Sequence, residues 1–516
     1  MASEENFDYI VVGAGSAGCV VARRLLDRLD CRVLLLEAGG SDDRASVHAT
    51  DLGSMTSMWG PEDVSWPYRT APQPGLDGRR IDLTQGKIIG GGSSINAMMY
   101  VRGNRHDFDH WAELGNPGWS YQDVLPYFRR AERYAGKPSQ YRGTDGPLSV
   151  IDYENPSAVS QAFVAGAAEL GHDVEHDYNG ERQEGGGFFY QSTRTPDNQR
   201  ASTAAGYLDP VLDDPRLTVL TGALVSRVLV ADGRATGVEF RQDGQTRTAR
   251  ADAEVILTAG ALASPKLLLL SGIGPEEELR RHGVPLVHEL AGVGRNLQDH
   301  LLFGVGYESL QDLPFPQLLA EAGLFARSRE REGITGGGPD LQFFFGPVQF
   351  IADQYKTEGP GFTFAPILAQ PRSRGFVHLS SADPAALPVV DPHYLTAEAD
   401  VQVLVRGLAL SREIVHTSAF DPFRGRELAP GPEAVDPAEL AGYVRQNAST
   451  VWHPVGTCRM GHGLDAVVDA ALRVHGIERL RVADASIMPT ITTGNTNAAT
   501  IMIAEKAADL ITDAAR

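Results

Sequence analysis

The sequence predicts a mixed α/β fold (α+β overall) with two layers of different type: a parallel sheet extended by a β-meander, and an antiparallel sheet covered by helices. Residues 7–39 read as strand, glycine turn, helix and strand, and residues 219–257 alternate between apolar and polar positions. Aromatic, strand-like segments follow between residues 341 and 379. The 516-residue length exceeds the limit of a single hydrophobic core, about 250–300 residues, so we expect at least two domains.

The first βαβ unit contains a nucleotide-binding pattern. The apolar run Phe7–Val12 predicts a strand, about Ala17–Leu29 a helix, and Arg32–Leu36 a second strand. Three glycines between the first strand and the helix fit the pattern G-x-G-x-x-G, and an acidic residue closes the second strand 19 residues after the last of these glycines. This order of elements is typical of a Rossmann-like, dinucleotide-binding domain.

Each residue of that pattern has a physical role. Gly13 permits the tight turn, Gly15 lets a pyrophosphate approach the backbone, and Gly18 lets the helix pack closely on the strand. The free N–H groups at the start of the helix would face the phosphates, and the Glu37 carboxylate could hold the adenosine ribose hydroxyls. An ordinary glycine-rich turn would leave Glu37 unexplained, so we predict dinucleotide binding.

A second glycine cluster, GKIIGGGSSINAMMY, covers residues 86–100. Consecutive glycines followed by serines and an asparagine predict a loop that runs into a helix and can approach a planar ligand closely. On its own, this pattern is more typical of a surface turn. Residues 104–130 then predict a helical region used for packing.

The alternating region predicts a β-meander, because its two Asp-Gly pairs are typical hairpin turns. The expected strands lie near 224–231, 235–241 and 246–250, and are followed by a separate apolar strand, Glu254–Thr258. Gly260 comes next, and Ser264 and Pro265 predict the N-cap and first turn of a helix. We expect this second strand–glycine–helix unit to rejoin the first sheet.

The middle of the chain predicts the antiparallel layer. Its strand-like segments are Leu341–Phe345, Phe362–Leu368 and Phe376–Leu379. The stretch Gly333–Gly338 precedes them and is either a mobile entrance loop or a plain linker. Further on, Asp436 begins a capping box with proline at the first helical position, which predicts a helix ending near Asn447.

The composition excludes several function classes. A net charge of -20 argues against nucleic acid and anionic membrane surfaces as partners. No apolar run approaches the ~20 residues of a membrane helix, and the acidic start, MASEENFDYI, does not resemble a signal peptide. Three scattered cysteines predict no disulfide framework, and no Cys/His cluster has metal-ligand spacing. We therefore expect a cytoplasmic protein with no metal, no nucleic-acid partner and no membrane span.

Together these segments resemble the glucose–methanol–choline (GMC) family of FAD oxidoreductases over nearly the whole chain. The matching segments, in family order, are Gly86–Gly103, Gly260–Gly274, PRSRGFVHLSS (371–381) with DPHYL (391–395), HPVGTCRMG (453–461) and NTNAATIMIAEKAAD (495–509). On this resemblance we expect a discontinuous FAD-binding domain formed by residues 1–155, 195–300 and 450–516. A substrate-binding domain would comprise residues 156–194 and 301–449.

The resemblance also implies which residues bind FAD. The ADP half would contact Gly13, Gly15, Ser16, Ala17, Gly18, Glu37 and Ala38, with Val225 at the adenine. The flavin end would contact Gly91, Ser94, Asn96, Ala97, Met98, Trp452, Asp484, Ala485, Asn497 and Thr500. Some members of the family attach the flavin through a histidine just before the signature asparagine. That position is Ile95 here, so we predict non-covalent FAD.

The resemblance places the catalytic base at His453 and its partner at Asn495. Alcohol oxidation removes a hydroxyl proton and a hydride, and the hydride goes to flavin N5. A neutral histidine can accept the proton because its ordinary pKa is about 6.5, and an amide can donate to the developing alkoxide. On its own, a histidine beside a proline is more often a structural hydrogen-bonding residue. Trp452 either walls the pocket beside the flavin or packs in the core.

We therefore expect FAD-dependent oxidation of a primary alcohol to the aldehyde, with electrons passed to O2 or another acceptor. The His–Asn pair resembles the choline and aryl-alcohol branches of the family more than the sugar-oxidising branches, which have two histidines. Two alternatives remain open: a non-oxidative flavoenzyme, either a lyase or a photodecarboxylase, on the same fold, and a non-catalytic FAD-binding protein. The sequence does not separate an oxidase from a dehydrogenase.

Overall fold

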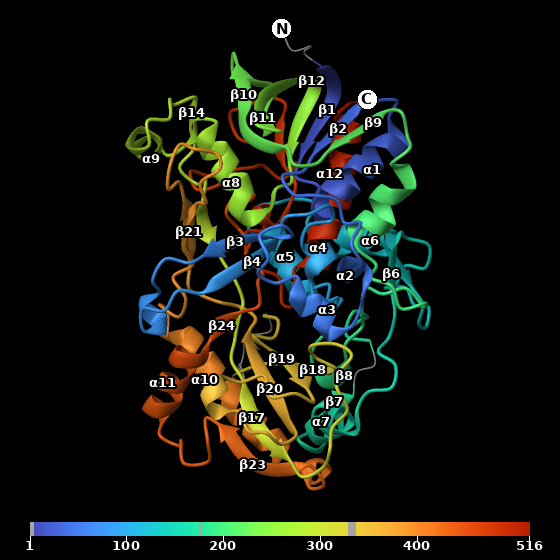
Figure 1. Cartoon of the computed structure of the whole chain (residues 1–516), viewed down its shortest axis with the longest axis vertical. Coiled ribbons are helices and arrows are strands. Elements are labelled where there is room, and N and C mark those ends of the chain that lie inside the picture. The colour runs from blue at the N-terminus through green and yellow to red at the C-terminus, as the bar shows by residue number, and fades with distance from the viewer. Residues whose placement is uncertain (1–4, 175–176, 329–336, 516) are drawn as a thin grey trace.

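The computed structural model describes residues 5–174, 177–328 and 337–515, so residues 333–336 of the predicted entrance loop or linker lie outside it. Figure 1 shows one sheet in the upper half of the molecule, a second sheet in the lower half, and short elements between them. In the described ranges the upper sheet has the strand order β10-β11-β12-β1-β2-β9, with β25 beside β12. These strands are β1 (Glu5–Val12), β2 (Val33–Leu36), β9 (Leu217–Leu220), β10 (Leu224–Ala231), β11 (Arg234–Gln242), β12 (Gln245–Leu257) and β25 (Leu480–Val482).

The predicted βαβ unit is confirmed. Strand β1 pairs in parallel with β2 on one side and with β12 on the other, and both of its faces are buried. Helix α1 (Ser16–Arg28) connects β1 to β2 and packs against the last helix, α12 (Asn497–Ala514). The carboxyl ends of β1, β2 and β12 therefore meet at one edge of the sheet, where a dinucleotide binds in folds of this type.

Strand β12 corrects one prediction. The sequence predicted a strand near 246–250 and a separate strand, Glu254–Thr258, but the chain forms one continuous strand. Residues 245–250 pair antiparallel with β11, residues 249–251 and 254–257 pair parallel with β1, and residues 255–257 pair parallel with β25. A β-bulge opposite Phe7 and Tyr9 adjusts the register, so the meander joins the parallel sheet without a break.

Helix α8 (Gly260–Leu270) corrects a second prediction, because it begins four residues before the predicted N-cap, Ser264. The carboxylate of Asp484 accepts the Gly260 N–H at 2.8 Å and the Ser264 hydroxyl at 2.6 Å. Pro265 thus lies inside the helix and cannot bond the Ala261 carbonyl. The Thr457 hydroxyl donates to that carbonyl instead, at 2.5 Å, which allows the proline at this position.

The short elements between the sheets carry the second glycine cluster. The hairpin β3 (Ser65–Arg69) and β4 (Asp82–Gly86) leads into a one-turn helix, α4 (Gly92–Ile95). The predicted helical region 104–130 consists of two helices, α5 (Arg105–Glu113) and α6 (Tyr121–Ala131), each of which begins with a capping box. Further short elements are α2 (Ala45–His48), α3 (Leu52–Ser57), β5 (Glu132–Tyr134), β6 (Leu148–Val150), β13 (Ile273–Gly274), α9 (Glu276–Arg281) and β14 (His288–Glu289).

The lower sheet has the strand order β23-β17-β20-β19-β18-β8-β7 in the described ranges, with β16 attached to β20 and β24 attached to β16. Its strands are β7 (Asp173–Val174), β8 (Gly186–Phe189), β16 (Leu301–Leu302), β17 (Val305–Ser309), β18 (Ala322–Ala326), β19 (Leu341–Gly346), β20 (Gly361–Leu368), β23 (Arg424–Ala429) and β24 (Ser449–Thr450). Helices α7 (Ala158–Glu169), α10 (Glu398–Val415) and α11 (Pro437–Asn447) belong to the same half of the molecule. The predicted antiparallel layer and the Asp436 N-cap are confirmed.

One predicted strand of that layer lies elsewhere. Residues 376–378 of this prediction fall in β21 (Gly375–His378), which pairs with β15 (Arg295–Leu297) and β22 (Val389–Asp391) in a separate small sheet. The two locations differ in burial: every residue of β19 and β20 is buried, whereas in β21 every second residue is only partly buried. Among the described residues, no helix is long and apolar enough to cross a membrane.

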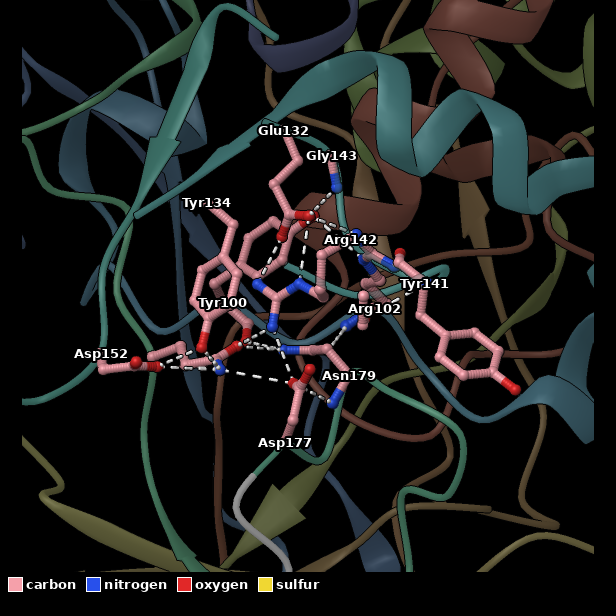
Figure 2. Close-up of polar contacts among 12 residues, drawn as sticks. Tyr100, Arg102, Glu132, Tyr134, Tyr141, Arg142, Gly143, Asp152, Asp177 and Asn179 are labelled. Atoms are coloured by element: carbon pink, nitrogen blue, oxygen red, sulfur yellow. Dashed lines mark hydrogen bonds and ion pairs between the residues drawn. The ribbon is translucent and has the colours of Figure 1, made fainter. Parts of the chain in front are cut away.

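A buried ionic network fixes the segments beside the second glycine cluster (Figure 2). The Glu132 carboxylate lies between two arginines, 2.5 Å from Arg102 Nη2 and 2.6 Å from Arg142 Nη2. Arg142 also contacts Asp177 at 2.7 Å and lies over the ring of Tyr134. Burial alone would raise the pKa of Glu132, but the two guanidinium groups outweigh it and hold this pKa below its ordinary value.

Candidate active site

A cavity lies between the sheets, at the carboxyl ends of β1 and β12. At one end it is lined by Gly13, Glu37 and Val225, and at the other by His453 and Asn495. Both parts are lined by Gly15, Gly91 and Thr258, among others, so they form one continuous passage. The passage brings together residues from positions 13 to 500, as the sequence predicted for a long cofactor with its reactive end at His453.

The predicted residues fall into two groups. Those that line the passage are Gly13, Gly15, Ser16, Ala17, Glu37, Ala38, Gly91, Asn96, Ala97, Met98, Val225, Trp452, His453, Asp484, Ala485, Asn495, Asn497 and Thr500. Gly18 and Ser94 do not line it. The Ser94 hydroxyl donates to the Ile89 carbonyl at 2.7 Å, so this side chain stabilises the glycine loop from behind and does not face a ligand.

The glycines let backbone segments approach each other closely beside the passage. Gly13 has a φ of +100°, and a Cβ there would lie 2.8 Å from the Thr258 carbonyl oxygen. A Cβ on Gly18 would lie 1.9 Å from the Gly13 oxygen, so only glycine allows α1 to approach β1 this closely. A Cβ on Gly91 would lie 2.7 Å from Gly15 Cα, in the passage between the two glycine loops. These contacts fit the close backbone approach that a dinucleotide pyrophosphate requires.

Two buried carboxylates border the passage. Glu37, at the end of β2, accepts the Ala14 N–H at 2.9 Å and the Gly39 N–H at 2.8 Å. Burial nevertheless raises the pKa of Glu37 to about 7. Burial likewise raises the pKa of Asp484, which fixes the start of α8 through Gly260 and bonds the Ser486 N–H at 2.8 Å.

The far end of the passage holds the predicted catalytic pair. His453 Nε2 lies 3.5 Å from Asn495 Nδ2. Gln342 Nε2 donates to Asn495 Oδ1 at 3.2 Å, which orients the asparagine amide with its N–H groups toward the histidine. Burial, together with the neighbouring His300, lowers the pKa of His453 well below its ordinary value, so the ring is neutral at neutral pH.

The sequence did not identify three candidate functional residues: Asp299, His300 and Gln342. Asp299 Oδ1 accepts the backbone N–H groups of His300 and His453, at 2.9 and 2.8 Å. His300 Nδ1 lies 3.0 Å from His453 Nδ1. The available signal was the polar run 296–300 before a short apolar strand, but nothing in it indicates which residues it meets.

A short ladder connects these residues. Strand β16 follows His300 directly, β24 ends three residues before His453, and the two strands pair antiparallel through Leu301–Thr450 and Leu302–Ser449. Strand β16 also pairs with β20 of the lower sheet. The two histidines are therefore attached to neighbouring strands of the same sheet.

Apolar and aromatic side chains form the walls around His453. They include Trp59, Leu302, Leu319, Phe344, Phe350, Val451 and Trp452. The Trp452 ring lies 4.8 Å from the Trp59 ring, and its N–H donates to the Asp82 carbonyl at 3.2 Å, so Trp452 is a wall of the passage. Among the described residues, Asp484 is the charged side chain in this part of the passage, and no group of three or more His, Cys, Asp or Glu side chains could hold a metal ion.

Comparisons with known proteins agree with this geometry. Models of the GMC oxidoreductase family match residues 7–302 and 371–504. Oxygen-dependent choline dehydrogenase 1 of Chromohalobacter salexigens is 41% identical over 540 residues, covering 99% of this chain and 96% of that protein. Pyridoxine 4-oxidase of Mesorbium loti superposes with a TM-score of 0.91 at 33% identity, covering 97% and 98% of the two chains. A formate oxidase of Aspergillus oryzae, studied for FAD modification, superposes with a TM-score of 0.89 at 26% identity, covering 99% of each chain.

Proposed function

The chain belongs to the GMC oxidoreductase family and is an FAD-dependent enzyme that oxidises CH–OH donors, and on this premise we propose the roles of its residues. The predicted residues that line the passage hold FAD, with Glu37 at the adenosine ribose and the Asn96 and Asn497 region at the flavin. The glycine contacts support this, because a Cβ at Gly13 would lie 2.8 Å from the Thr258 carbonyl oxygen and one at Gly91 would lie 2.7 Å from Gly15 Cα, so only glycine allows these backbone segments of the passage to approach so closely. When bound, FAD supplies N5 as the hydride acceptor.

FAD is bound without a covalent link in this proposal. The position where some family members attach the flavin is Ile95, whose hydrocarbon side chain cannot form such a bond. The start of α12 borders the passage through Thr496, Asn497 and Thr500. Its positive helix end would favour negative charge on a flavin bound in the passage.

His453 is the base that removes the hydroxyl proton of a primary alcohol. The observation that carries this role is the pair of side chains at the end of the passage: His453 Nε2 and Asn495 Nδ2 lie 3.5 Å apart and line the same cavity. As the O–H bond breaks, the proton passes to His453, and the Asn495 amide donates a hydrogen bond to the substrate oxygen. The C–H hydride leaves in the same oxidation, and the product is the aldehyde.

The substrate is a neutral primary alcohol with an apolar or aromatic body. Four aromatic rings, Trp59, Phe344, Phe350 and Trp452, wall the site. Asp484, the carboxylate that the described residues place in this part of the passage, already accepts hydrogen bonds from Gly260, Ser264 and Ser486, so it is not free to pair with a substrate cation. Choline is the second candidate, because the relative from Chromohalobacter salexigens is named a choline dehydrogenase and aromatic faces can hold a quaternary ammonium group. O2 is the electron acceptor in this proposal, as the names of that relative and of the oxidases suggest.

The non-oxidative alternative, a lyase or photodecarboxylase, is not favoured, since the relatives are dehydrogenases and oxidases. A cytoplasmic location is part of the proposal and is supported by three cysteines that are buried and unpaired. The proposal also divides the chain into two domains. The FAD-binding domain comprises residues 1–155, 195–300 and 450–516, and the substrate-binding domain comprises residues 156–194 and 301–449. This division follows the membership of the two large sheets.

An anaerobic titration tests the function. Bleaching of the flavin by benzyl-type alcohols at lower concentrations than by choline supports the neutral substrate, and the reverse order supports choline. His453→Ala should slow flavin reduction by about 10²–10⁴-fold, the range for loss of a general base, while FAD stays bound. A wild-type rate of reduction in this variant would remove His453 from the mechanism, and a flavin that no alcohol bleaches would contradict alcohol oxidation.

A further inference from the structure

A second histidine lies directly behind the proposed base. His300 is fully buried, and its ring meets the His453 ring edge to face, with the two Nδ1 atoms 3.0 Å apart. The other ring nitrogen of His300, Nε2, lies 3.0 Å from the carbonyl oxygen of Ala369. His300 does not line the passage, so any effect on the substrate must pass through His453.

These contacts determine where the protons lie. A carbonyl oxygen only accepts hydrogen bonds, so His300 Nε2 carries the proton that bonds Ala369. A neutral imidazole carries one N–H, which leaves a lone pair on His300 Nδ1. Two lone pairs 3.0 Å apart would repel, so His453 Nδ1 must carry its proton and donate it to His300. His453 Nε2 is then the atom with the free lone pair, and it faces Asn495 and the cavity.

The surroundings of His300 keep it neutral. Burial lowers the pKa of His300 to about 4, which supports the single-proton assignment at neutral pH. The nearest carboxylate, Asp299, is occupied by other donors: its Oδ1 accepts the two backbone N–H groups, and its Oδ2 accepts the hydroxyls of Thr450 and Tyr394. Burial raises the pKa of Asp299 to about 6. Asp299 therefore fixes the backbone of both histidines and contacts neither ring.

We propose that His300 is a positioning residue that fixes His453 in the Nδ1–H tautomer and so presents Nε2 as the base. When the substrate O–H bond breaks, an N–H bond forms at His453 Nε2. The hydride from the carbon that bears this oxygen would pass to FAD, which supplies the oxidant when bound. His453 then carries both protons, and its Nδ1–H remains bonded to the lone pair of His300. The positive charge is thus stabilised by a neutral ring. This inference rests on the proposed role of His453.

Two substitutions separate positioning from a structural role. His300→Leu removes the acceptor for His453 Nδ1–H, so the His453 proton should move to Nε2 and block the base. His300→Asn keeps an acceptor oxygen near the position of Nδ1. The matched control is His475→Leu, because His475 also bonds a backbone carbonyl, Gly461, at 3.1 Å but lies outside the passage.

Flavin reduction by a saturating alcohol is measured anaerobically between pH 5 and 9, together with FAD content and thermal midpoint. We expect His300→Leu to lower the limiting rate by roughly 10–100-fold, the usual effect of losing a partner that orients a functional histidine, with little change in the alcohol concentration at half-saturation. His300→Asn should recover most of the rate, and His475→Leu should match the wild type.

The tautomer is read independently by long-range ¹H–¹⁵N spectra of protein labelled at the histidine rings, with the His453 signals assigned from His453→Ala. His453 should be protonated at Nδ1 in the wild type and at Nε2 in His300→Leu. A wild-type rate in His300→Leu would overturn the proposal, as would equal losses in the Leu and Asn variants accompanied by FAD release. If His453→Ala reduces its flavin at the wild-type rate, the base assignment itself fails, and the spectra still report whether His300 sets the tautomer.

Discussion

Replacing Glu132 by Gln tests the buried ionic network of Figure 2. The Glu132 carboxylate accepts N–H groups from Arg102 Nη2 at 2.5 Å, Arg142 Nη2 at 2.6 Å and Gly143 at 2.9 Å. A glutamine has nearly the same volume but no charge, and its NH₂ group would face arginine donors. Arg142 keeps its contact with Asp177, whereas Arg102 would be left as a buried cation without a carboxylate.

The expected size of the effect follows from that unpaired charge. Breaking a buried pair by removing one partner costs about 3–5 kcal/mol. At 1.36 kcal/mol per tenfold change, amide hydrogen exchange in segments 132–150 and 177–191 should become about 10²–10⁴-fold faster. The assay is hydrogen exchange followed by mass spectrometry of peptides from these segments.

A surface pair provides the control. Glu478 contacts Arg234 at 2.7 Å, but its side chain is 70% exposed, so Glu478→Gln should change the free energy of unfolding by less than about 1 kcal/mol.

The pH dependence of the Glu132 contribution has a definite sign. Because the pKa of Glu132 is lowered in the folded protein, its contribution is present above the unfolded pKa of about 4.3 and is lost as the pH falls through the lower folded value. Equal exchange rates in the two variants at pH 7 would refute the reasoning.

Three further outcomes are expected. Gly18→Ala should lower the FAD content and reduce the free energy of unfolding by about 1–3 kcal/mol, because its Cβ would lie 1.9 Å from the Gly13 oxygen. The control Gly442→Ala, which has open space around it, should change neither quantity. Flavin absorbance measures the FAD content, and thermal unfolding measures the stability. In FAD-free protein, the pKa of Glu37 is raised from 4.5 to about 7, so its contribution to stability falls as pH rises between these values. In Glu37→Gln the thermal midpoint should no longer fall as the pH rises across that range. A midpoint that falls as in the wild type would contradict the claim that burial raises the pKa of Glu37. Acid precipitation should leave the flavin in the supernatant, and flavin that stays with the pellet would contradict non-covalent binding.

Local sequence patterns predicted the parts of the fold that depend on neighbours in the chain. The glycine turn after β1 and the two Asp-Gly turns of the meander are as expected, with positive φ at Asp232 and Asp243. The start of α8 was mispredicted, because Asp484, 224 residues after Gly260, accepts the first N–H of the helix. No pattern around residues 260–265 contains that contact. Strand β12 was predicted as two strands for a similar reason, because its second half pairs with β1 and β25, which lie far away in the sequence.

The candidate site shows the same limit. The family resemblance supplied His453 and Asn495, and the structure brings them together. The position of the Asp299 carboxylate is fixed by the hydroxyls of Tyr394 and Thr450, which lie 95 and 151 residues further along the chain. Polar residues in a loop have no periodicity, so their partners cannot be read from spacing. The tautomer of His453 depends on the Ala369 carbonyl, which any residue type could supply.

The pairing of β16 with β24 has a consequence for redesign of the pocket. Leu302 on β16 and Val451 just after β24 both line the substrate end, while the same two segments carry His300 and His453. A substitution that changes the spacing of these strands in order to fit a larger alcohol would also alter the distance between the two imidazoles. Substrate range and base geometry are therefore mechanically linked at this ladder, whereas Phe344 and Phe350, on other segments, offer positions where the pocket can be enlarged without that penalty.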